Sequence, residues 1–250
     1  MATKATKKRK NMAAALTDSQ KTLHKNLEFT ATEQYKLLRA NLTFTLPKQE
    51  GCTIIGVTSS MRGEGKSTTA VNLSYVLAEA GNKVLLIDGD LRIPSIAKKM
   101  RIESSPGLTD CLKDSDAKQF RTFESSHISN WHILPAGSLP PNPSELLGSQ
   151  RMESVLKTLS GCYDYIVVDL PPVNLVSDAL AISKYIHGML LVVREDYTEK
   201  KELEHCIRQL ELSSVNVLGC VMNESKNGKS SYRRYKYKRY YKYYRYSSYT

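Results

Sequence analysis

Residues 52–81 contain the pattern that most constrains how this chain can fold. An apolar, β-branched run, Cys52–Thr58, predicts a strand, and the segment SSMRGEGKSTT at 59–69 is rich in glycine and small polar residues. A helical pattern, Ala70–Gly81, follows directly. Strand, glycine-rich turn, Gly-Lys-Ser and helix in this order are the layout of a phosphate-binding P-loop. We therefore expect a nucleotide to bind where the turn meets the start of the helix.

The chemistry of phosphate binding explains the spacing of these residues. Gly63 and Gly65 allow backbone conformations that are closed to residues with a Cβ atom. The N–H groups of the turn and of the helix N-terminus form a cradle of partial positive charge. Lys66 can reach the β- and γ-phosphates, and the Ser67 hydroxyl can ligate Mg²⁺. Ser60 stands where the usual pattern has its first glycine. The residues predicted to bind the nucleotide in this segment are Gly63, Glu64, Gly65, Lys66, Ser67 and Thr68.

Two further predicted strands end in acidic residues. The segment Asn82–Pro94 predicts a buried strand that leads to Asp88 and Asp90, and Tyr163–Val173 predicts another that ends at Asp169. Ligands of open α/β sheets bind beyond the carboxyl ends of the strands, so the three carboxylates should gather near the P-loop. There they can hold Mg²⁺ or its waters, or accept a proton. One such Asp alone is more often a turn former or a helix cap, and it is the combination that favours a catalytic site.

Strand-like and helical patterns alternate along the chain, which favours an α/β fold of the P-loop NTPase type, a mainly parallel sheet with helices on both faces. Strands are expected at Cys52–Thr58, Lys83–Asp88, Trp131–Pro135, Tyr165–Asp169, Met189–Val193 and Val217–Met222. Helices are expected at Glu33–Phe44, Lys66–Ala80, Leu108–Asp114, Ser144–Leu159, Ser177–Ile186 and Thr198–Leu210. We expect a flexible basic segment at 1–27, one P-loop domain at 28–225 and a disordered, low-complexity segment at 226–250.

The net charge of +11 is concentrated at the two ends of the chain. Residues 229–250 carry eight Lys or Arg and no acid, and their subtraction leaves +3 for residues 1–228. The basic start lacks the apolar region of a secretory signal, and no apolar run approaches the ~20 residues that span a bilayer. Five cysteines are scattered without CxxC spacing, which favours reduced thiols in the cytosol over a metal–sulfur centre.

The C-terminal segment holds nine of the fifteen tyrosines of the chain. Three functions fit such a segment. Its hydroxyls could accept phosphate in a kinase site. Its cations and rings could instead bind nucleic acid, or an anionic membrane surface. The P-loop favours the first of these. The candidate acceptors are Tyr232, Tyr235, Tyr237, Tyr240, Tyr241, Tyr243, Tyr244, Tyr246 and Tyr249.

The motifs together resemble one family. GEGKSTTAVNL, LLIDGDLR and YIVVDLPP are similar to the Walker A, Walker A′ and Walker B motifs of bacterial protein-tyrosine kinases, which are deviant P-loop ATPases related to MinD and ParA. EQYKLLRANLTF, LPAGSLPPNPSELL and the tyrosine cluster agree with this, so the resemblance covers Glu33 to Thr250. It points to the cytoplasmic kinases of capsular and exopolysaccharide synthesis.

The resemblance implies an ATP-dependent kinase that autophosphorylates in trans on its C-terminal tyrosines. The catalytic residues would be Lys66, Asp88, Asp90 and Asp169, with Asp88 receiving or orienting the tyrosyl proton. The implied cofactors are ATP and Mg²⁺, and Mg²⁺ would be held by Ser67, Asp90 and Asp169. Asn223, at the end of the last predicted strand, would contact the adenine edge.

The resemblance also implies partners. A helix bearing Glu33, Lys36 and Arg39 would contact a neighbouring subunit in a ring-shaped octamer. A separate transmembrane adaptor of the polysaccharide co-polymerase type would recruit the kinase to the inner face of the plasma membrane, and a cognate tyrosine phosphatase would reverse its action. Nucleic acid is not an expected partner.

Two departures from the kinase family pattern are visible. Lys36 replaces an arginine and loses its bidentate fork, and Leu170 replaces the threonine after the Walker B Asp. Met61 stands where MinD- and ParA-type proteins carry a signature lysine, which agrees with the kinase branch. The alternatives are a ParA/MinD-like ATPase that binds DNA or a membrane through its basic tail, and a nucleotide-binding regulatory subunit that transfers little phosphate.

Overall fold

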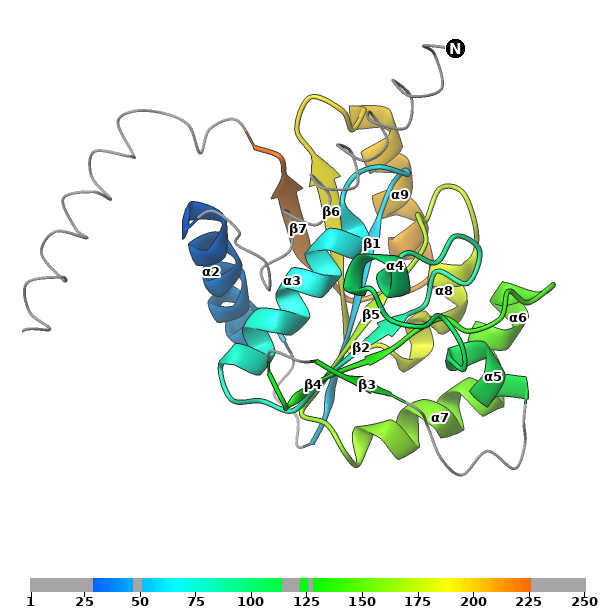
Figure 1. Ribbon diagram of the computed structural model, residues 1–250. Helices are drawn as coiled ribbons and strands as arrows, with labels where there is room; N and C mark the ends of the chain where they lie inside the picture. Colours follow the sequence, from blue (N-terminus) through cyan, green and yellow to red (C-terminus); the bar gives the residue numbers. More distant parts are fainter. Residues whose placement is uncertain (1–28, 47–50, 114–121, 126–127, 226–250) are drawn as a thin grey trace, which may run out of the picture.

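The computed structural model describes residues 29–46, 51–113, 122–125 and 128–225. The segments predicted to be a flexible start at 1–27 and a disordered tail at 226–250, with all nine candidate acceptor tyrosines, lie outside these residues. The remainder forms a mostly parallel sheet covered by helices on both faces, so the predicted fold class is confirmed (Figure 1).

The described residues form a seven-stranded sheet in the order β3-β4-β2-β5-β1-β6-β7. All neighbouring strands are parallel except the short β3, which pairs antiparallel with β4. The strands are β1 (Thr53–Ser59), β2 (Val84–Asp88), β3 (Phe123–Glu124), β4 (Trp131–Leu134), β5 (Tyr165–Asp169), β6 (Gly188–Arg194) and β7 (Val217–Asn223). Parallel neighbours end at the same edge, so the segments that follow β1, β2, β5 and β6 meet there.

Helices cover both faces of the sheet because its central strands are apolar on both sides. On β1, Ile54 packs in one hydrophobic cluster and its neighbour Ile55 in the other. The helices are α2 (Phe29–Thr45), α3 (Lys66–Glu79), α4 (Ile96–Met100), α5 (Leu108–Lys113), α6 (Pro143–Leu147), α7 (Gln150–Ser160), α8 (Asp178–Ile182), the 3₁₀ turn η2 (Ser183–Tyr185) and α9 (Lys200–Leu212).

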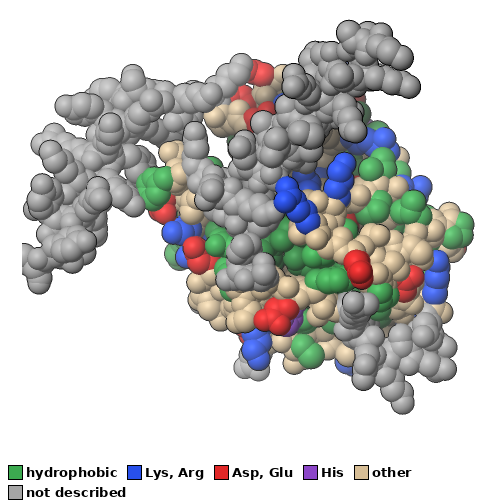
Figure 2. All heavy atoms as spheres, in the orientation of Figure 1, with side chains coloured by type: hydrophobic (Ala, Val, Ile, Leu, Met, Phe, Trp, Pro, Cys, Tyr) green, Lys and Arg blue, Asp and Glu red, His purple; other side chains and the backbone are tan. Residues whose placement is uncertain are grey.

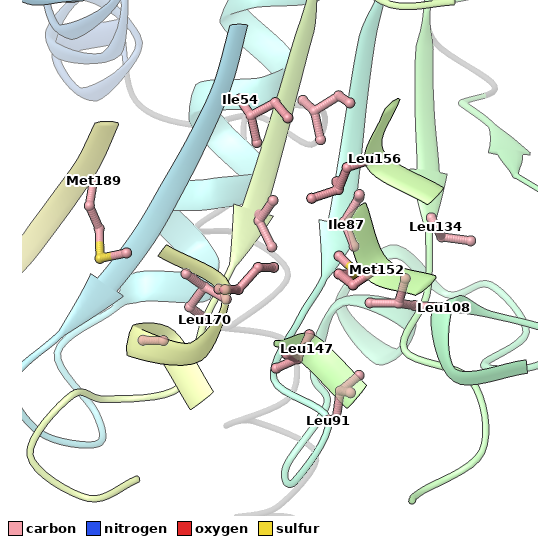
Figure 3. Packing of buried hydrophobic residues seen from close by; sticks show 14 of the residues in the cluster. Ile54, Ile87, Leu91, Leu108, Leu134, Leu147, Met152, Leu156, Leu170 and Met189 are labelled. Atoms are coloured by element: carbon pink, nitrogen blue, oxygen red, sulfur yellow. The ribbon is translucent and has the colours of Figure 1, made fainter. Parts of the chain in front are cut away.

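Each cluster brings a different set of helices to the sheet. Residues of α2, α3 and α4 pack on one face, where α2 (blue) lies along α3 (cyan) in Figure 1. Residues of α5 to α9 pack on the other face. Figure 3 shows this second cluster, with Met152 and Leu156 of α7 near Ile87 of β2. The site at the sheet edge is thus supported from both sides by a buried core.

Two predicted helices differ from those observed. The predicted helix Ser144–Leu159 is two helices, because α6 ends at Gly148 and α7 begins anew with Ser149 as its N-cap, whose hydroxyl accepts the Met152 N–H at 3.1 Å. The predicted helix Ser177–Ile186 is the short α8 followed by η2. The short α4 and β3 were not predicted.

The surface of the described residues carries charges of both signs. On the face seen in Figure 2, Lys and Arg side chains (blue) alternate with Asp and Glu side chains (red) and hydrophobic ones (green). No helix of the described residues has the length and apolarity required to cross a membrane.

Candidate active site

The predicted P-loop lies between β1 and α3, at the carboxyl edge of the sheet. Gly63 and Gly65 both have positive φ angles, of 83° and 98°. A Cβ atom on Gly65 would lie 1.9 Å from Nδ2 of Asn223, so a side chain at this position would displace Asn223 and strain the backbone. The two glycines therefore have the conformational role predicted from the sequence.

The side chain of Glu64 is fully buried inside the loop. Its carboxylate accepts hydrogen bonds from the Ser60 hydroxyl at 2.8 Å and from the Met61 N–H at 2.8 Å, and the Thr198 hydroxyl also donates to it. Ser60, which replaces the first glycine of the usual pattern, thus contributes a donor that closes the loop from within. Since the Glu64 carboxylate is engaged in this way, only its backbone N–H is available to a phosphate.

Lys66 joins the loop to the acidic residues of the neighbouring strands. Its Nζ lies 2.8 Å from Oδ2 of Asp90, 3.4 Å from Oδ1 of Asp169 and 3.3 Å from the Ser67 hydroxyl. Burial alone would lower the pKa of Lys66, but the charges of Asp169 and Asp90 outweigh burial and raise it. Lys66 is therefore held as a cation among carboxylates, where it neutralises part of their charge.

Asp88 and Asp169 end β2 and β5 and are paired directly across the two strands. Both are fully buried. One oxygen of Asp88 accepts the N–H groups of Ser95 and Ile96, at 3.0 and 2.9 Å. Its other oxygen, and one oxygen of Asp169, accept no hydrogen bond from the described residues. The sheet thus brings the predicted acids together and leaves two buried oxygens open to a ligand.

Burial and neighbouring charges change the pKa values of this pair. Burial, followed by the nearby charge of Asp169, raises the pKa of Asp88 to about 7. Burial also raises the pKa of Asp169, and the charge of Lys66 opposes that rise. A carboxyl group whose pKa lies near neutrality is suited to accept a proton during a reaction.

The residues also fit the implied Mg²⁺. Hydroxyl and carboxylate oxygens are the ligands that this hard cation prefers, and Ser67, Asp90 and Asp169 supply them. In the described part of the chain, no three His, Cys, Asp or Glu side chains form a complete metal site. Mg²⁺ commonly takes one or two protein ligands, with waters and substrate phosphates completing its shell, so the oxygens present suffice.

A second network orients the loop after β2. The Arg92 guanidinium binds the buried carboxylate of Asp178 through two hydrogen bonds, at 2.9 and 3.0 Å, and the Ser144 hydroxyl donates to the same carboxylate. In the same loop, Asp90 accepts the Ile93 N–H at 3.0 Å. Asn142 precedes the first turn of α6, and Ser144 lies within that helix. The network fixes the segment that carries Asp90.

Side chains from β6, β7 and the turn between β6 and α9 also contact the P-loop. Asn223 donates to the carbonyl of Glu64 at 2.9 Å, so it lies at the site as predicted. Tyr197 donates to the carbonyl of Arg62 at 3.0 Å. Tyr197, Thr198 and Arg194 were not identified from the sequence, where more than 130 residues separate them from the loop and no motif marks them.

The predicted oligomerisation residues lie on α2. Lys36 pairs with Glu33 of the same helix at 3.3 Å, and Arg39 donates to the carbonyl of Val76 in α3 at 2.5 Å. Arg39 thus attaches α2 to α3. Leu37 and Phe44 on this helix are 51% and 87% exposed.

Comparisons with known proteins agree with this geometry. A family model described as an AAA domain matches residues 52–218. The chain is 38% identical to the tyrosine-protein kinase YwqD of Bacillus subtilis over 180 residues, which are 72% of this chain and 75% of that protein. It is 32% identical to the tyrosine-protein kinase CpsD of Streptococcus agalactiae over 183 residues, 73% of this chain and 80% of that protein.

Solved structures show the same relationship. The chimerical protein CapA2B2 superimposes with a TM-score of 0.75 and 32% identity, over 81% of this chain and 88% of that one. The kinase domain of the Escherichia coli tyrosine kinase ETK gives 0.72 and 30%, over 78% of both. MinD of Pyrococcus horikoshii, complexed with Mg-ADP, gives 0.57 and 25%, over 70% of this chain and 72% of that one. The P-loop, the paired acids and these similarities lead to one conclusion: the chain belongs to the family of bacterial tyrosine-protein kinases.

Proposed function

We propose that this protein transfers the γ-phosphate of ATP to tyrosines in the C-terminal segment of another copy of itself. The observation that carries the proposal is the position of Asp88. It is a buried carboxyl group with one unpaired oxygen and a pKa of about 7, beside Asp169 and at the edge of the sheet that carries the P-loop. An oxygen that can accept a proton next to a phosphate-binding loop suits transfer to a hydroxyl group.

In the proposed reaction, the tyrosyl oxygen forms a bond to the γ-phosphorus, the bond to the β-phosphate oxygen breaks, and ADP leaves. The tyrosyl proton goes to Asp88. The P-loop amides and Lys66 hold the β- and γ-phosphates, and Asn223 contacts the adenine through the polar atoms not used on Glu64. When bound by Ser67, and through water by Asp90 and Asp169, Mg²⁺ supplies further charge neutralisation. Positioning and neutralisation account for most of the rate in phosphoryl transfer.

Membership of the family supports a proposal for the setting of the reaction. We place the kinase in the cytoplasm, recruited to the inner face of the plasma membrane by a separate transmembrane adaptor, where it regulates capsular or exopolysaccharide synthesis and export. A tyrosine phosphatase would reset it. Self-association in a ring is supported by the exposed apolar residues Leu37 and Phe44 of α2, the helix that carries Glu33 and Lys36.

The second candidate is a MinD-like ATPase, which the similarity to MinD favours. Met61 counts against it, because the signature lysine of that group is missing from the loop. In that case the nine tyrosines at 232–249 would serve only through their rings, and their hydroxyl groups would have no role.

Mixing two full-length variants tests the proposal. One variant has its nine C-terminal tyrosines changed to Phe and serves as the donor. The other, Lys66→Met, serves as the acceptor, and Lys200→Met is its matched control because Lys200 is an exposed lysine whose ion pair is with Glu204 of its own helix. With Mg²⁺ and ATP, mass spectrometry should find phosphotyrosine at 232–249 of the Lys66→Met chain only when the donor is present. Acceptor chains that stay unmodified beside a folded, nucleotide-binding donor would overturn transfer between copies.

A further inference from the structure

Three successive carbonyl groups of the P-loop are each held by a side chain from another part of the chain. The Tyr197 hydroxyl donates to the carbonyl of Arg62 at 3.0 Å, and Arg194 Nη1 donates to that of Gly63 at 3.1 Å. Asn223 Nδ2 donates to the carbonyl of Glu64 at 2.9 Å. The three donors come from the end of β6, the turn after it and the end of β7.

Because of the geometry of the peptide bond, these contacts also fix the directions of the neighbouring N–H groups. A trans peptide is planar, and its C=O and N–H point in opposite directions. A donor that fixes the carbonyl of one residue therefore also fixes the direction of the next residue's N–H. The three contacts orient the N–H groups of Gly63, Glu64 and Gly65. None of these three N–H groups donates to another described residue, so all three are available to an anion on the other side of the loop.

We propose that Tyr197, Arg194 and Asn223 are positioning residues, which hold the loop so that three successive N–H groups face the bound phosphates. This inference rests on the proposed nucleotide binding. A loop oriented in advance does not lose conformational entropy when the ligand arrives, and this is how preorganisation increases affinity. The positive φ angles of Gly63 and Gly65 give the backbone the freedom to adopt this arrangement, and the three donors select it.

Arg194 is itself held on two further sides. Its Nη2 lies 2.6 Å from Oε2 of Glu224, and its guanidinium stacks on the ring of Tyr197, with Cζ 4.9 Å from the ring centroid. Glu224 immediately follows β7. The pair Arg194–Glu224 thus connects the end of β7 to the side chain that holds the Gly63 carbonyl.

The chain offers matched controls for the two variants that test this. Tyr185, like Tyr197, donates its hydroxyl to a backbone carbonyl at 3.0 Å, but to that of Ser149, away from the loop. Arg151 donates to the carbonyl of Cys111 at 3.3 Å, also away from the loop. Tyr197→Phe and Tyr185→Phe therefore lose similar hydrogen bonds, as do Arg194→Met and Arg151→Met, and only the first of each pair touches the loop.

The measurement is the dissociation constant of Mg-ADP for the full-length protein, together with hydrogen exchange of the loop amides without nucleotide. Loss of one hydrogen bond predicts about 3- to 10-fold weaker binding for Tyr197→Phe, and loss of a charged donor predicts about 10-fold or more for Arg194→Met. Both should speed exchange at residues 63–65. Arg194→Lys should recover part of the affinity, and Glu224→Gln should lose a smaller part than Arg194→Met. The controls should bind as the parent does.

The inference is overturned if Tyr197→Phe and Arg194→Lys bind Mg-ADP with the parent affinity and exchange at the parent rate. These two mild variants decide the matter even if Arg194→Met does not fold. A general loss of stability would weaken Tyr185→Phe as much as Tyr197→Phe, which would also count against a positioning role. Parent protein that binds Mg-ADP but never transfers phosphate would contradict the proposed kinase activity and leave this inference intact.

Discussion

Lys66 holds together carboxylates that would otherwise repel one another. It lies between Asp90 and Asp169, and Asp88 is paired with Asp169 across the strands. The residue that the sequence predicts to be a phosphate ligand is therefore also the counter-ion of the acidic cluster. Removing it should affect stability as well as chemistry.

We expect Lys66→Met to lower phosphate transfer by at least about 10²- to 10³-fold, since it removes a charge aimed at the transferred group. At pH 8 it should also lower the free energy of unfolding, by roughly 3–5 kcal/mol, because buried carboxylates lose their partner. Denaturant unfolding with and without the second substitution Asp90→Asn measures this, and the double variant should be the more stable one. Equal stability of Lys66→Met and Lys200→Met at pH 8 would show that the ion pairs contribute nothing net.

The raised pKa of Asp88 predicts that the stability of the protein depends on pH. Its pKa is raised from 3.8 to about 7 in the folded protein, so the folded state binds a proton that the unfolded state releases. The stability from this proton is fully present below the unfolded pKa and is lost as the pH rises through about 7. At pH 8, Asp88→Asn should therefore have a free energy of unfolding roughly 1–3 kcal/mol higher than that of the parent, and a higher melting temperature. At pH 5 both differences should be much smaller. Thermal melts at the two pH values test this.

The same substitution should abolish most of the transfer, because an amide cannot accept the tyrosyl proton. A transfer rate equal to that of the parent would exclude Asp88 as the proton acceptor. A stability difference that is independent of pH would instead assign the pKa near 7 to another group.

Among the elements, α2 has the clearest division between two faces. Leu42 packs in the core beside α3, and Arg39 donates to Val76, whereas Leu37 and Phe44 are exposed. The helix is thus attached to its own chain on one side and presents apolar side chains on the other.

We expect Leu37→Asp and Phe44→Asp to prevent self-association and to change the free energy of unfolding by only about 0.5 kcal/mol, since both side chains are exposed. Light scattering after size-exclusion chromatography measures the mass. Leu212→Asp, at an exposed position in α9, is the matched control and should assemble as the parent does. Unchanged mass in all three variants would mean that α2 is not the contact.

Elements with a strong local signal could be predicted from the sequence. The strand Tyr165–Asp169 matches its prediction, and β2 differs from its prediction by one residue. A short apolar run that ends in an acidic residue marks both ends of such a strand in the sequence. The break at Gly148 could not be predicted, since PPNPSELL and the helical pattern after it read as one helix. The short α4 follows from a tertiary contact: its first N–H groups bind Asp88.

Some residues of the site could likewise be predicted from the sequence, and others could not. Lys66 and the three acids were predicted because each follows a strand in a local motif. Tyr197 and Arg194 were not, since their role depends on β6 lying next to β1 in the sheet. Sequence spacing carries no information about that neighbour.

For the whole molecule, the uneven charge should couple phosphorylation to assembly. Residues 229–250 include eight Lys and Arg and no acidic residue, and each phosphate adds a charge of about −1.5 to −2. After about five or six transfers the segment is net negative and should leave a neighbour's site, where Asp88, Asp90 and Asp169 repel it. Light scattering at equal concentration and salt should show a smaller mass for the phosphorylated protein. An equal or larger mass after phosphorylation would contradict this coupling.

The place of β1 in the sheet also determines when the loop can begin to work. β1 pairs with β5 and β6, and Asn223 contacts Glu64 across 159 residues of sequence. At about 5–20 residues per second of synthesis, the loop waits roughly 8–30 s for that contact. Until β5 has been made, β1 is an apolar strand without either of its neighbours, which is the kind of segment that chaperones bind. Nucleotide binding is thus acquired only when almost all of the folded part has been made.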